Sequence, residues 1–508
     1  MPRAADEPAS SRTWPASACR RATIASLAAA LFVLITRPAA LAADPAISAP
    51  LREAVTVEGI LRHLRALQDV ASRNGGDRAA GTPGHDASAA YVAATLRAAG
   101  YAVETRAFEF PYFEETAPPS LTLDGPPDDV VGPAGLRALR FSGAGEVAAA
   151  LAEVDFAAPA TANGSTSGCE PADFAGFPRG AVALLRRGTC TFQAKVGNAV
   201  VAGAVGVVIA NDGAPGRADA FPGGLAGPAA VPAVAVGHAA GERLRASAAA
   251  GAPVRLAVRA RTGVRRTSTV LAETAAGDPG RVLVVGAHLD GVPEGPGIND
   301  NGSGAAVVLE IALQLARLGT APAGRVRFAF WGGEELGLLG SRRHVDGLTA
   351  AGRGRIAAVL NLDMVGSPNH GRFVHDGDGS AGGRAGPGGS AAVERVLADY
   401  FRDAGLPVGP TPLEGRSDYG PFMAAGIAVG GLYAGGPERK TRAQAGLFGG
   451  AAGEPFDPCY HAACDGLANV SPRALDELGD AAAHAALALA LALDAALGGG
   501  VVRRGPPA

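Results

Sequence analysis

The chain has 508 residues, a formal net charge of −3 and 18% charged residues. This length is sufficient for two or three domains, and the nearly balanced charge gives no indication of a nucleic-acid partner. Glycine is abundant, at 73 residues, which indicates long loops.

Residues 1–42 are typical of a secretory signal peptide. Arg20 and Arg21 form a basic region, residues 22–35 form an apolar core too short for a membrane span, and Ala-Leu-Ala at 40–42 is a small-x-small cleavage site. A single-span anchor is the alternative, and the export route (general secretory or twin-arginine) stays open. We expect an exported protein, periplasmic or extracellular, without stable membrane association.

Four cysteines remain after removal of this signal. An even number in an exported chain predicts disulfides, and four cysteines allow three pairings. We favour local pairing because each pair then falls within one predicted module: Cys169 with Cys190, and Cys459 with Cys464.

The main domain begins at about residue 50, and its first part extends to residue 117. Residues 56–72 have apolar side chains on one helical face, and residues 86–99 have a second helical pattern that Gly100 ends. The alternation in residues 101–110 predicts a strand. This order is typical of entry into an α/β sheet.

Residues 118–262 differ in character from the flanking sequence. Charged residues are sparse, Gly and Pro are frequent, and short apolar runs recur between turns. We expect a separate insert without catalytic residues. The main domain then resumes at residues 263–497, and residues 498–508 are expected to be disordered.

Three apolar runs between residues 282 and 363 organise the second part of the main domain. They are VLVVGAHLD, RVRFAFWGGEE and AAVLNLD, and their composition predicts buried strands of a parallel sheet. A helical pattern at 302–318 separates the first two. The runs end on acids or a possible metal ligand: His288 and Asp290, Glu334 and Glu335, and Asp363. Carboxyl ends of parallel strands lie at one edge, so these side chains should converge.

The expected chemistry of that edge is a pair of metal ions. His288, Asp300, Glu335 and Asp363 are ligand types that zinc accepts, and one more imidazole would complete two sites. Asp300 lies on a glycine-rich loop and is the expected bridge. Glu334 is free to act as general base. Asp290 is expected to accept the second ring proton of His288. A single acid at a strand end is usually a helix cap or a surface charge, but that explanation fits the whole set poorly.

These motifs resemble the co-catalytic di-zinc aminopeptidases, especially secreted bacterial enzymes that prefer bulky apolar N-terminal residues. The resemblance rests on HLDG, GINDNGSG, WGGEELGLLGS and NLDMVGS, and extends to GRSDYGPF at 415–422 and FDPCYHAACDGLANV at 456–470. It implies a mixed, mostly parallel twisted sheet flanked by helices. SGCEPADF and the sequence at 179–212 resemble a protease-associated (PA) domain, a small β-rich insert. Whether it is decorative, or covers the cleft or selects longer substrates, stays open.

The resemblance also implies roles for particular residues. His288 and Asp363 would hold one zinc, Glu335 and His461 the other, with Asp300 between them. Glu334 would be the base and then the acid. The Asp300–Asn301 peptide is expected to be cis.

The resemblance implies roles for three further residues. Tyr460 would donate a hydrogen bond to the tetrahedral oxyanion, unless it is only a packed aromatic side chain. Arg416 would lie near the substrate, or else form a surface ion pair. Tyr433 would belong to a side pocket.

The predicted function is therefore removal of an N-terminal residue, apolar by resemblance, from peptides with a free N-terminus, with two Zn²⁺ ions as cofactors. A carboxypeptidase or dipeptidase, a glutaminyl cyclase with a single zinc, and a noncatalytic binding protein are the alternatives. The sequence leaves the natural substrate, propeptide processing and oligomeric state open.

Two C-terminal features complete the prediction. Residues 371–390, rich in glycine, are expected to form a surface loop before a helix at 391–404. Ser471 is expected to cap a last helix at 473–497, with Pro472 at its first position.

Overall fold

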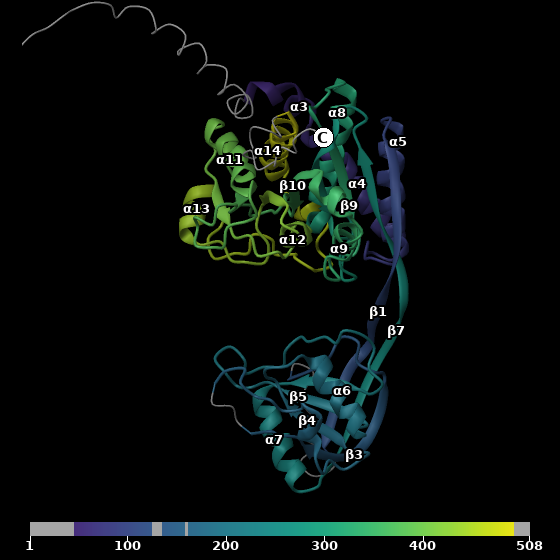
Figure 1. Cartoon of the computed structure of the whole chain (residues 1–508). Helices are drawn as coiled ribbons and strands as arrows, with labels where there is room; N and C mark the ends of the chain where they lie inside the picture. Colours follow the sequence, from purple (N-terminus) through teal and green to yellow (C-terminus); the bar gives the residue numbers. More distant parts are fainter. Residues whose placement is uncertain (1–44, 124–134, 158–160, 492–508) are drawn as a thin grey trace, which may run out of the picture. The chain divides into compact units, whose positions relative to one another are not determined.

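The computed structural model describes residues 45–123, 135–157 and 161–491, and Figure 1 shows its elements. The expected signal peptide at 1–42 and tail at 498–508 lie outside the described residues. The described residues form two compact units, one from 45–106 with 268–491 and one from the described part of 107–267. The insert expected at 118–262 falls within the second unit.

The first unit is built on a mixed sheet in the order β12-β11-β13-β10-β8-β9-β7. Its four central strands are parallel neighbours, whereas β7 runs antiparallel to β9 and β11 antiparallel to β13. The predicted mixed, mostly parallel sheet is confirmed. The strands are β7 (Pro253–Glu273), β8 (Asp278–His288), β9 (Gly324–Trp331), β10 (Ile356–Asp363), β11 (Phe373–His375), β12 (Gly409–Thr411) and β13 (Ala428–Tyr433).

Helices cover both faces of this sheet because side chains alternate between the faces of the buried strands. Leu283 and Val285 of β8 belong to the core of one face, and Val282 and Val284 belong to the core of the other. On the first face lie α3 (Ala49–Ala54), α4 (Val57–Arg73), α5 (Pro83–Ala98), α8 (Gly304–Leu318), α11 (Ser390–Asp403) and α14 (Pro472–Leu491). On the second lie α9 (Leu339–Asp346) and α12 (Tyr419–Ala424).

Shorter helical segments connect these elements. They are η1 (Pro45–Ser48), η4 (Ile298–Ser303), α10 (Ala350–Gly354), α13 (Arg442–Phe448) and η5 (Leu467–Asn469). None of the helices within the described ranges is long and apolar enough to cross a bilayer.

Local sequence signals fix where the long helices begin. Thr56 precedes α4, and its hydroxyl accepts a hydrogen bond from the N–H of Gly59 at 3.1 Å. Ser471 caps α14 in the same way, accepting from Ala474 at 3.2 Å. The part of the last predicted helix beyond residue 491 lies outside the described residues.

The glycine-rich stretch at 371–390 contains an element that the sequence does not predict. Phe373–His375 form strand β11, which pairs with both β12 and β13. Three residues are too few to establish a period-2 pattern, so only the sheet context reveals this strand.

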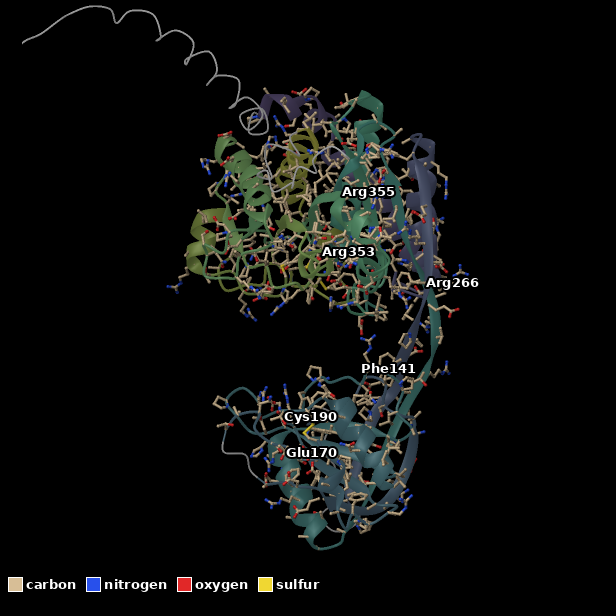
Figure 2. All side chains as sticks on the ribbon, viewed as in Figure 1. Phe141, Glu170, Cys190, Arg266, Arg353 and Arg355 are labelled. Carbon is tan, nitrogen blue, oxygen red and sulfur yellow. A yellow bond between two sulfur atoms is a disulfide. The ribbon has the colours of Figure 1, made fainter. Side chains whose placement is uncertain are left out.

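In the second unit the strands β7, β3, β4, β5, β6 and β2 are neighbours in that order, with β1 also paired to β7. Helices α6 and α7 pack with it, so the unit is less purely β than expected. Its elements are β1 (Ala102–Leu123), β2 (Leu136–Ala138), β3 (Gly145–Glu153), η3 (Pro171–Phe174), β4 (Val182–Arg186), α6 (Phe192–Ala202), β5 (Gly206–Ala210), β6 (Ala233–Val236) and α7 (His238–Ala249). Cys169 and Cys190 form a disulfide in this unit (Figure 2).

Candidate metal centre

Three neighbouring parallel strands deliver the predicted side chains to one edge of the sheet. His288 ends β8 and is paired in register with Trp331, the last residue of β9. Glu334 and Glu335 follow just beyond Trp331. Asp363 ends β10, which pairs with β8 on its other side. The convergence expected from the strand ends is therefore present in the fold.

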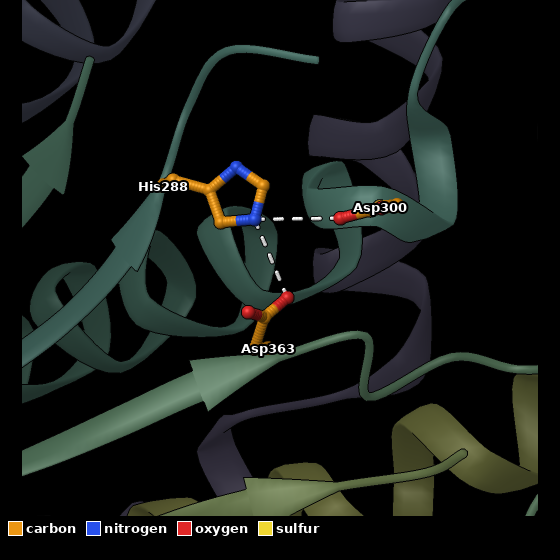
Figure 3. Close-up of side chains that lie close together, drawn as sticks. All are labelled: His288, Asp300 and Asp363. Atoms are coloured by element: carbon orange, nitrogen blue, oxygen red, sulfur yellow. Dashed lines mark ion pairs between the residues drawn. The ribbon is translucent and has the colours of Figure 1, made fainter. Parts of the chain in front are cut away.

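The first group of ligand atoms surrounds the imidazole of His288. Its Nε2 atom lies 3.3 Å from Asp300 Oδ1 and 3.3 Å from Asp363 Oδ1 (Figure 3). The side chains of His288 and Asp300 are only 2% and 7% exposed. Three potential ligands from three different segments thus face one another in a nearly enclosed position.

The second group surrounds His461. Its Nε2 atom lies 3.1 Å from Asp300 Oδ2 and 3.2 Å from Glu335 Oε2. The two oxygens of Asp300 therefore face different imidazoles. A carboxylate with one oxygen in each of two ligand groups has the arrangement required to bridge two ions.

The donors in this site fit zinc. Two carboxylate oxygens, Glu335 Oε1 and Asp363 Oδ1, are buried without a hydrogen-bond partner. Among the described residues, no Lys or Arg lies within ion-pair distance of the five predicted ligands. Buried, uncompensated carboxylates together with two imidazoles form the oxygen and nitrogen set that zinc binds.

The electrostatics of the site favour bound cations. Burial raises the pKa of Glu334 well above its ordinary value, and the carboxylates of Asp418 and Asp363 add to this effect. Burial and the charge of Asp300 raise the pKa of Glu335 to about 7. Burial opposes protonation of His461, but its contacts with Asp300 and Glu335 raise its pKa to about 10. The concentrated negative charge that raises these pKa values would equally attract metal cations to the same positions.

The loop that carries Asp300 is held by its own polar residues. Gly297 has φ +62°, which favours glycine, and the Asp300–Asn301 peptide is cis, as the resemblance implies. The Asn301 side-chain oxygen accepts from the N–H of Gly304 at 2.9 Å and of Met364 at 3.2 Å. The loop is thereby fixed to the end of β10, where Asp363 lies.

His461 lies inside a small covalent ring. Cys459 and Cys464 form a disulfide around it, so both predicted pairings are confirmed. The ring of Tyr460 stacks on that of His461, with centroids 3.8 Å apart. Gly295 packs so closely against this ring that an added Cβ would lie 2.2 Å from the carbonyl oxygen of Ala462. Any larger residue at 295 would displace the segment that holds His461.

The expected contact of Asp290 is wrong in one respect. Nδ1 of His288 lies 3.0 Å from the main-chain carbonyl of Asp290, whereas the Asp290 carboxylate is 3.9 Å away. That carboxylate instead accepts a hydrogen bond from the N–H of Glu334 at 3.2 Å. The Asp290 side chain does not reach the ring because the N–H of Glu334 holds it. Asp290 therefore supports both His288 and Glu334, but through different atoms.

Two predicted substrate residues lie in the wall of a cavity of about 880 Å³ that includes the ligand groups. The Arg416 side chain is 81% exposed and forms an ion pair with Glu414 at 2.8 Å. Tyr433 ends β13 beside Asp363, and its hydroxyl donates to Glu438 at 3.1 Å. Tyr460 also contributes to this wall.

Three buried charged residues near the site, Arg78, Asp418 and Asp465, were not identified from the sequence. Arg78 is fully buried and donates to the main-chain carbonyls of Leu289, Pro296 and Gly297. No side-chain pattern indicates such a role, because its partners are all main-chain atoms more than 200 positions away.

Asp465 and Asp418 lie within motifs that the resemblance does include. Asp465 directly follows Cys464 and binds the Asp300 loop. Asp418 belongs to GRSDYGPF, is buried, and has neither carboxylate oxygen hydrogen-bonded. Burial raises its pKa to about 7. Because both residues belong to motifs that carry the family resemblance, the sequence could have indicated a role for them.

Known proteins match both units of the chain. Residues 269–486 match peptidase family M28, and residues 151–244 match the PA domain. An aminopeptidase of Pseudomonas aeruginosa (strain UCBPP-PA14) is 43% identical over 435 residues, covering 85% of this chain and 81% of that protein. The chain belongs to peptidase family M28. The predicted family and inserted PA domain are confirmed.

Other relatives agree with this M28 assignment. A probable lipoprotein aminopeptidase of Mycobacterium tuberculosis is 39% identical, covering 86% of this chain and 85% of that protein. Among solved structures, an aminopeptidase from Aneurinibacillus sp. strain AM-1 has a TM-score of 0.66 at 26% identity, covering 87% of this chain and 96% of that chain. A zinc aminopeptidase from Bacillus subtilis has a TM-score of 0.59 at 26% identity, covering 85% and 94%. This M28 chain is a metallo-aminopeptidase, and peptides are its substrates.

Proposed function

We propose that this M28 enzyme is exported, uses two zinc ions, and removes apolar N-terminal residues from peptides with Glu334 as general base. One observation carries the two-ion part of the proposal. Asp300 directs one carboxylate oxygen toward His288 and the other toward His461, at 3.3 and 3.1 Å. A single-ion site has no need of this arrangement.

The five ligands divide into two sets. His288 and Asp363 would hold the first zinc, Glu335 and His461 the second, and Asp300 both. When bound, zinc supplies a water of lowered pKa and polarises the scissile carbonyl. The chain's contribution is to hold these donors rigidly, since four of the five ligand side chains are less than a fifth exposed.

Glu334 has the properties of the proton carrier. It lies among the ligand groups, with a carboxylate oxygen close to His288 and Glu335, but is not required by either ligand set. Burial raises the pKa of its carboxyl well above the ordinary value. It would accept a proton from the attacking water at a carboxylate oxygen and return it to the leaving amine.

The cavity favours an amine over a carboxylate as the substrate's charged group. Its lining contains six acidic side chains and two arginines. Arg416 is exposed and already paired with Glu414. A carboxypeptidase or dipeptidase would have to bind the substrate carboxylate with Arg342, the other arginine, in a lining dominated by acidic side chains, so these alternatives have less support.

Apolar and aromatic side chains in the same cavity favour an apolar first residue. They are Met364, Phe373, Tyr419, Tyr433 and Phe456. Tyr460 stacks beside His461 and would donate its hydroxyl to the oxygen that gains charge during attack.

Two observations support export. The Cys169–Cys190 and Cys459–Cys464 disulfides indicate an oxidising compartment. The sequence at 1–42 has the features of a cleaved secretory signal. We propose a periplasmic or extracellular location.

A panel of aminoacyl p-nitroanilides tests the proposal. We expect leucyl and phenylalanyl substrates to be hydrolysed, acetyl-leucyl p-nitroanilide to be resistant, and a chelator to abolish activity. Metal analysis should give two zinc ions per chain. Hydrolysis of the acetylated substrate would contradict exopeptidase action at a free amine. A stoichiometry near one zinc with cyclisation of N-terminal glutamine would instead favour a glutaminyl cyclase.

A further inference from the structure

A second group of acidic side chains lies outside the zinc site, in the segment that follows strand β11 and on helix α11. Asp376 directly follows His375, the last residue of β11, and Asp378 lies two residues further on. Glu394 reaches them from α11. Each offers one carboxylate oxygen, and these three atoms all lie within 4.8 Å of one another. That is the largest separation that a single cation can span with bonds of about 2.4 Å.

Asp376 gives independent evidence of a missing partner. The residue is 1% exposed, and its Oδ1 atom is buried without a hydrogen-bond partner. Its other oxygen accepts from the N–H of Ala381 at 3.0 Å. A buried, unpaired carboxylate oxygen costs free energy unless a proton or a cation binds it.

Arg395 acts on Asp378 through its charge, but no described protein cation contacts the acidic group directly. Within the described ranges, no Lys or Arg forms an ion pair with Asp376, Asp378 or Glu394 at 4.0 Å or less. The carboxylates are held near each other by main-chain contacts: Glu394 Oε2 accepts from the N–H of Gly377 at 2.9 Å and of Asp378 at 3.1 Å. The chain therefore maintains three like charges close together.

We propose that Asp376, Asp378 and Glu394 bind a calcium ion. Three carboxylates are hard oxygen ligands, which calcium prefers and which lack the nitrogen or sulfur typical of zinc sites. The spacing Asp376-Gly-Asp378-Gly matches ligands placed at alternate positions of a glycine-containing loop, as in calcium-binding loops. Calcium takes six to eight oxygen ligands, so water would complete its coordination here, whereas magnesium demands a more regular octahedron.

The ion would stabilise one wall of the substrate cavity. Phe373 and His375 of β11 line that cavity, and the acidic loop continues directly from them. Glu394 anchors the same loop to α11, which packs in the main core through Val393 and Leu397. Calcium binding links strand, loop and helix, so its effect is on the stability of the loop and not on the chemical step.

Calorimetric titration of the zinc-loaded enzyme with CaCl₂ is the direct test. We expect one calcium per chain, with a Kd on the order of 10⁻⁴ M as in extracellular modules, and unchanged zinc content. Glu394→Gln and Asp378→Asn should each weaken binding at least tenfold. Asp403→Asn, an exposed acid at the end of the same helix, should bind as the wild type does. Absence of calcium binding, or equal binding by Glu394→Gln, overturns the proposal.

Trypsin provides a second readout that does not depend on activity. Arg384 is exposed within the loop between Asp378 and α11. We expect calcium to slow cleavage after Arg384 at least tenfold in the wild type and to have no effect in Glu394→Gln. Magnesium at the same concentration should protect less. Equal cleavage with and without calcium in the wild type overturns the assignment, while aminopeptidase activity independently reports on the zinc site.

Discussion

The carboxylate of Asp465 accepts a hydrogen bond from the main-chain N–H of Asp300 at 3.0 Å. Its other oxygen accepts from the N–H of Asn299 at 2.9 Å. Asp465 directly follows the disulfide ring that holds His461. One buried side chain thus joins the segments that carry Asp300 and His461, which are 161 positions apart in the sequence.

Replacing Asp465 with Asn should weaken zinc binding. The amide has only one oxygen, so one of the two N–H groups would face an NH₂ group and lose its acceptor. We expect zinc affinity to fall about 10–100-fold, the usual effect of losing a residue that orients metal ligands. Competition titration with a chromophoric chelator measures this, and Asp403→Asn is the charge-matched control. Wild-type affinity in Asp465→Asn would show that this contact does not position the ligands.

Glu334→Gln should separate chemistry from metal binding. Gln cannot accept and return a proton, so turnover should fall about 10²–10⁴-fold while both zinc ions stay bound. Steady-state kinetics and metal analysis on the same sample give both quantities. Glu414→Gln removes a carboxylate from the cavity rim and should keep most of the activity. Normal turnover in Glu334→Gln would remove Glu334 from the mechanism.

Arg78→Lys should destabilise the first unit although it conserves charge. The guanidinium contacts three carbonyls at once, and a lysine ammonium on a flexible stem cannot reproduce that geometry. We expect a loss of about 2–4 kcal/mol from carbonyls left without donors. Urea unfolding measures the loss. Arg73→Lys, at a residue 79% exposed on α4, should change stability little.

His344 should contribute stability to the first unit that is lost as the pH drops below about 6.5. Burial lowers the pKa of His344 to about 3, and Arg106 donates to its Nδ1 at 3.2 Å, which requires the neutral ring. The unfolded chain takes up a proton near pH 6.5 and the folded chain does not. The stabilisation is therefore complete above that pH and is lost progressively toward pH 3.

Trp331, which packs against His344 with ring centroids 5.3 Å apart, reports this unfolding by its fluorescence. Between pH 7 and pH 5 we expect His344 to account for about 2 kcal/mol of lost stability. His344→Phe should show a correspondingly smaller loss over the same interval. An identical pH dependence in the variant would contradict the assignment. Burial also lowers the pKa of His375, to about 4, so the variant should keep a part of the dependence.

The fold and the ligand positions were largely predictable because their signals are local. The apolar run ending at His288 specifies a buried strand, and parallel neighbours place strand ends together. The features that the sequence does not reveal depend on main-chain atoms. Arg78 and Asp465 bind carbonyls and N–H groups of distant loops, and the carbonyl of Asp290, not its side chain, contacts His288. A pattern of side chains contains no information about those partners.

The Cys459–Cys464 ring has a consequence for the order of maturation. Because His461 lies within the ring, we expect the proposed second metal site to form only after the two thiols are oxidised. We expect a newly made chain in a reducing environment to bind the proposed second zinc weakly. Its peptidase activity inside the producing cell should therefore be low. The zinc content per chain, measured side by side for the reduced and the oxidised protein, tests this expectation.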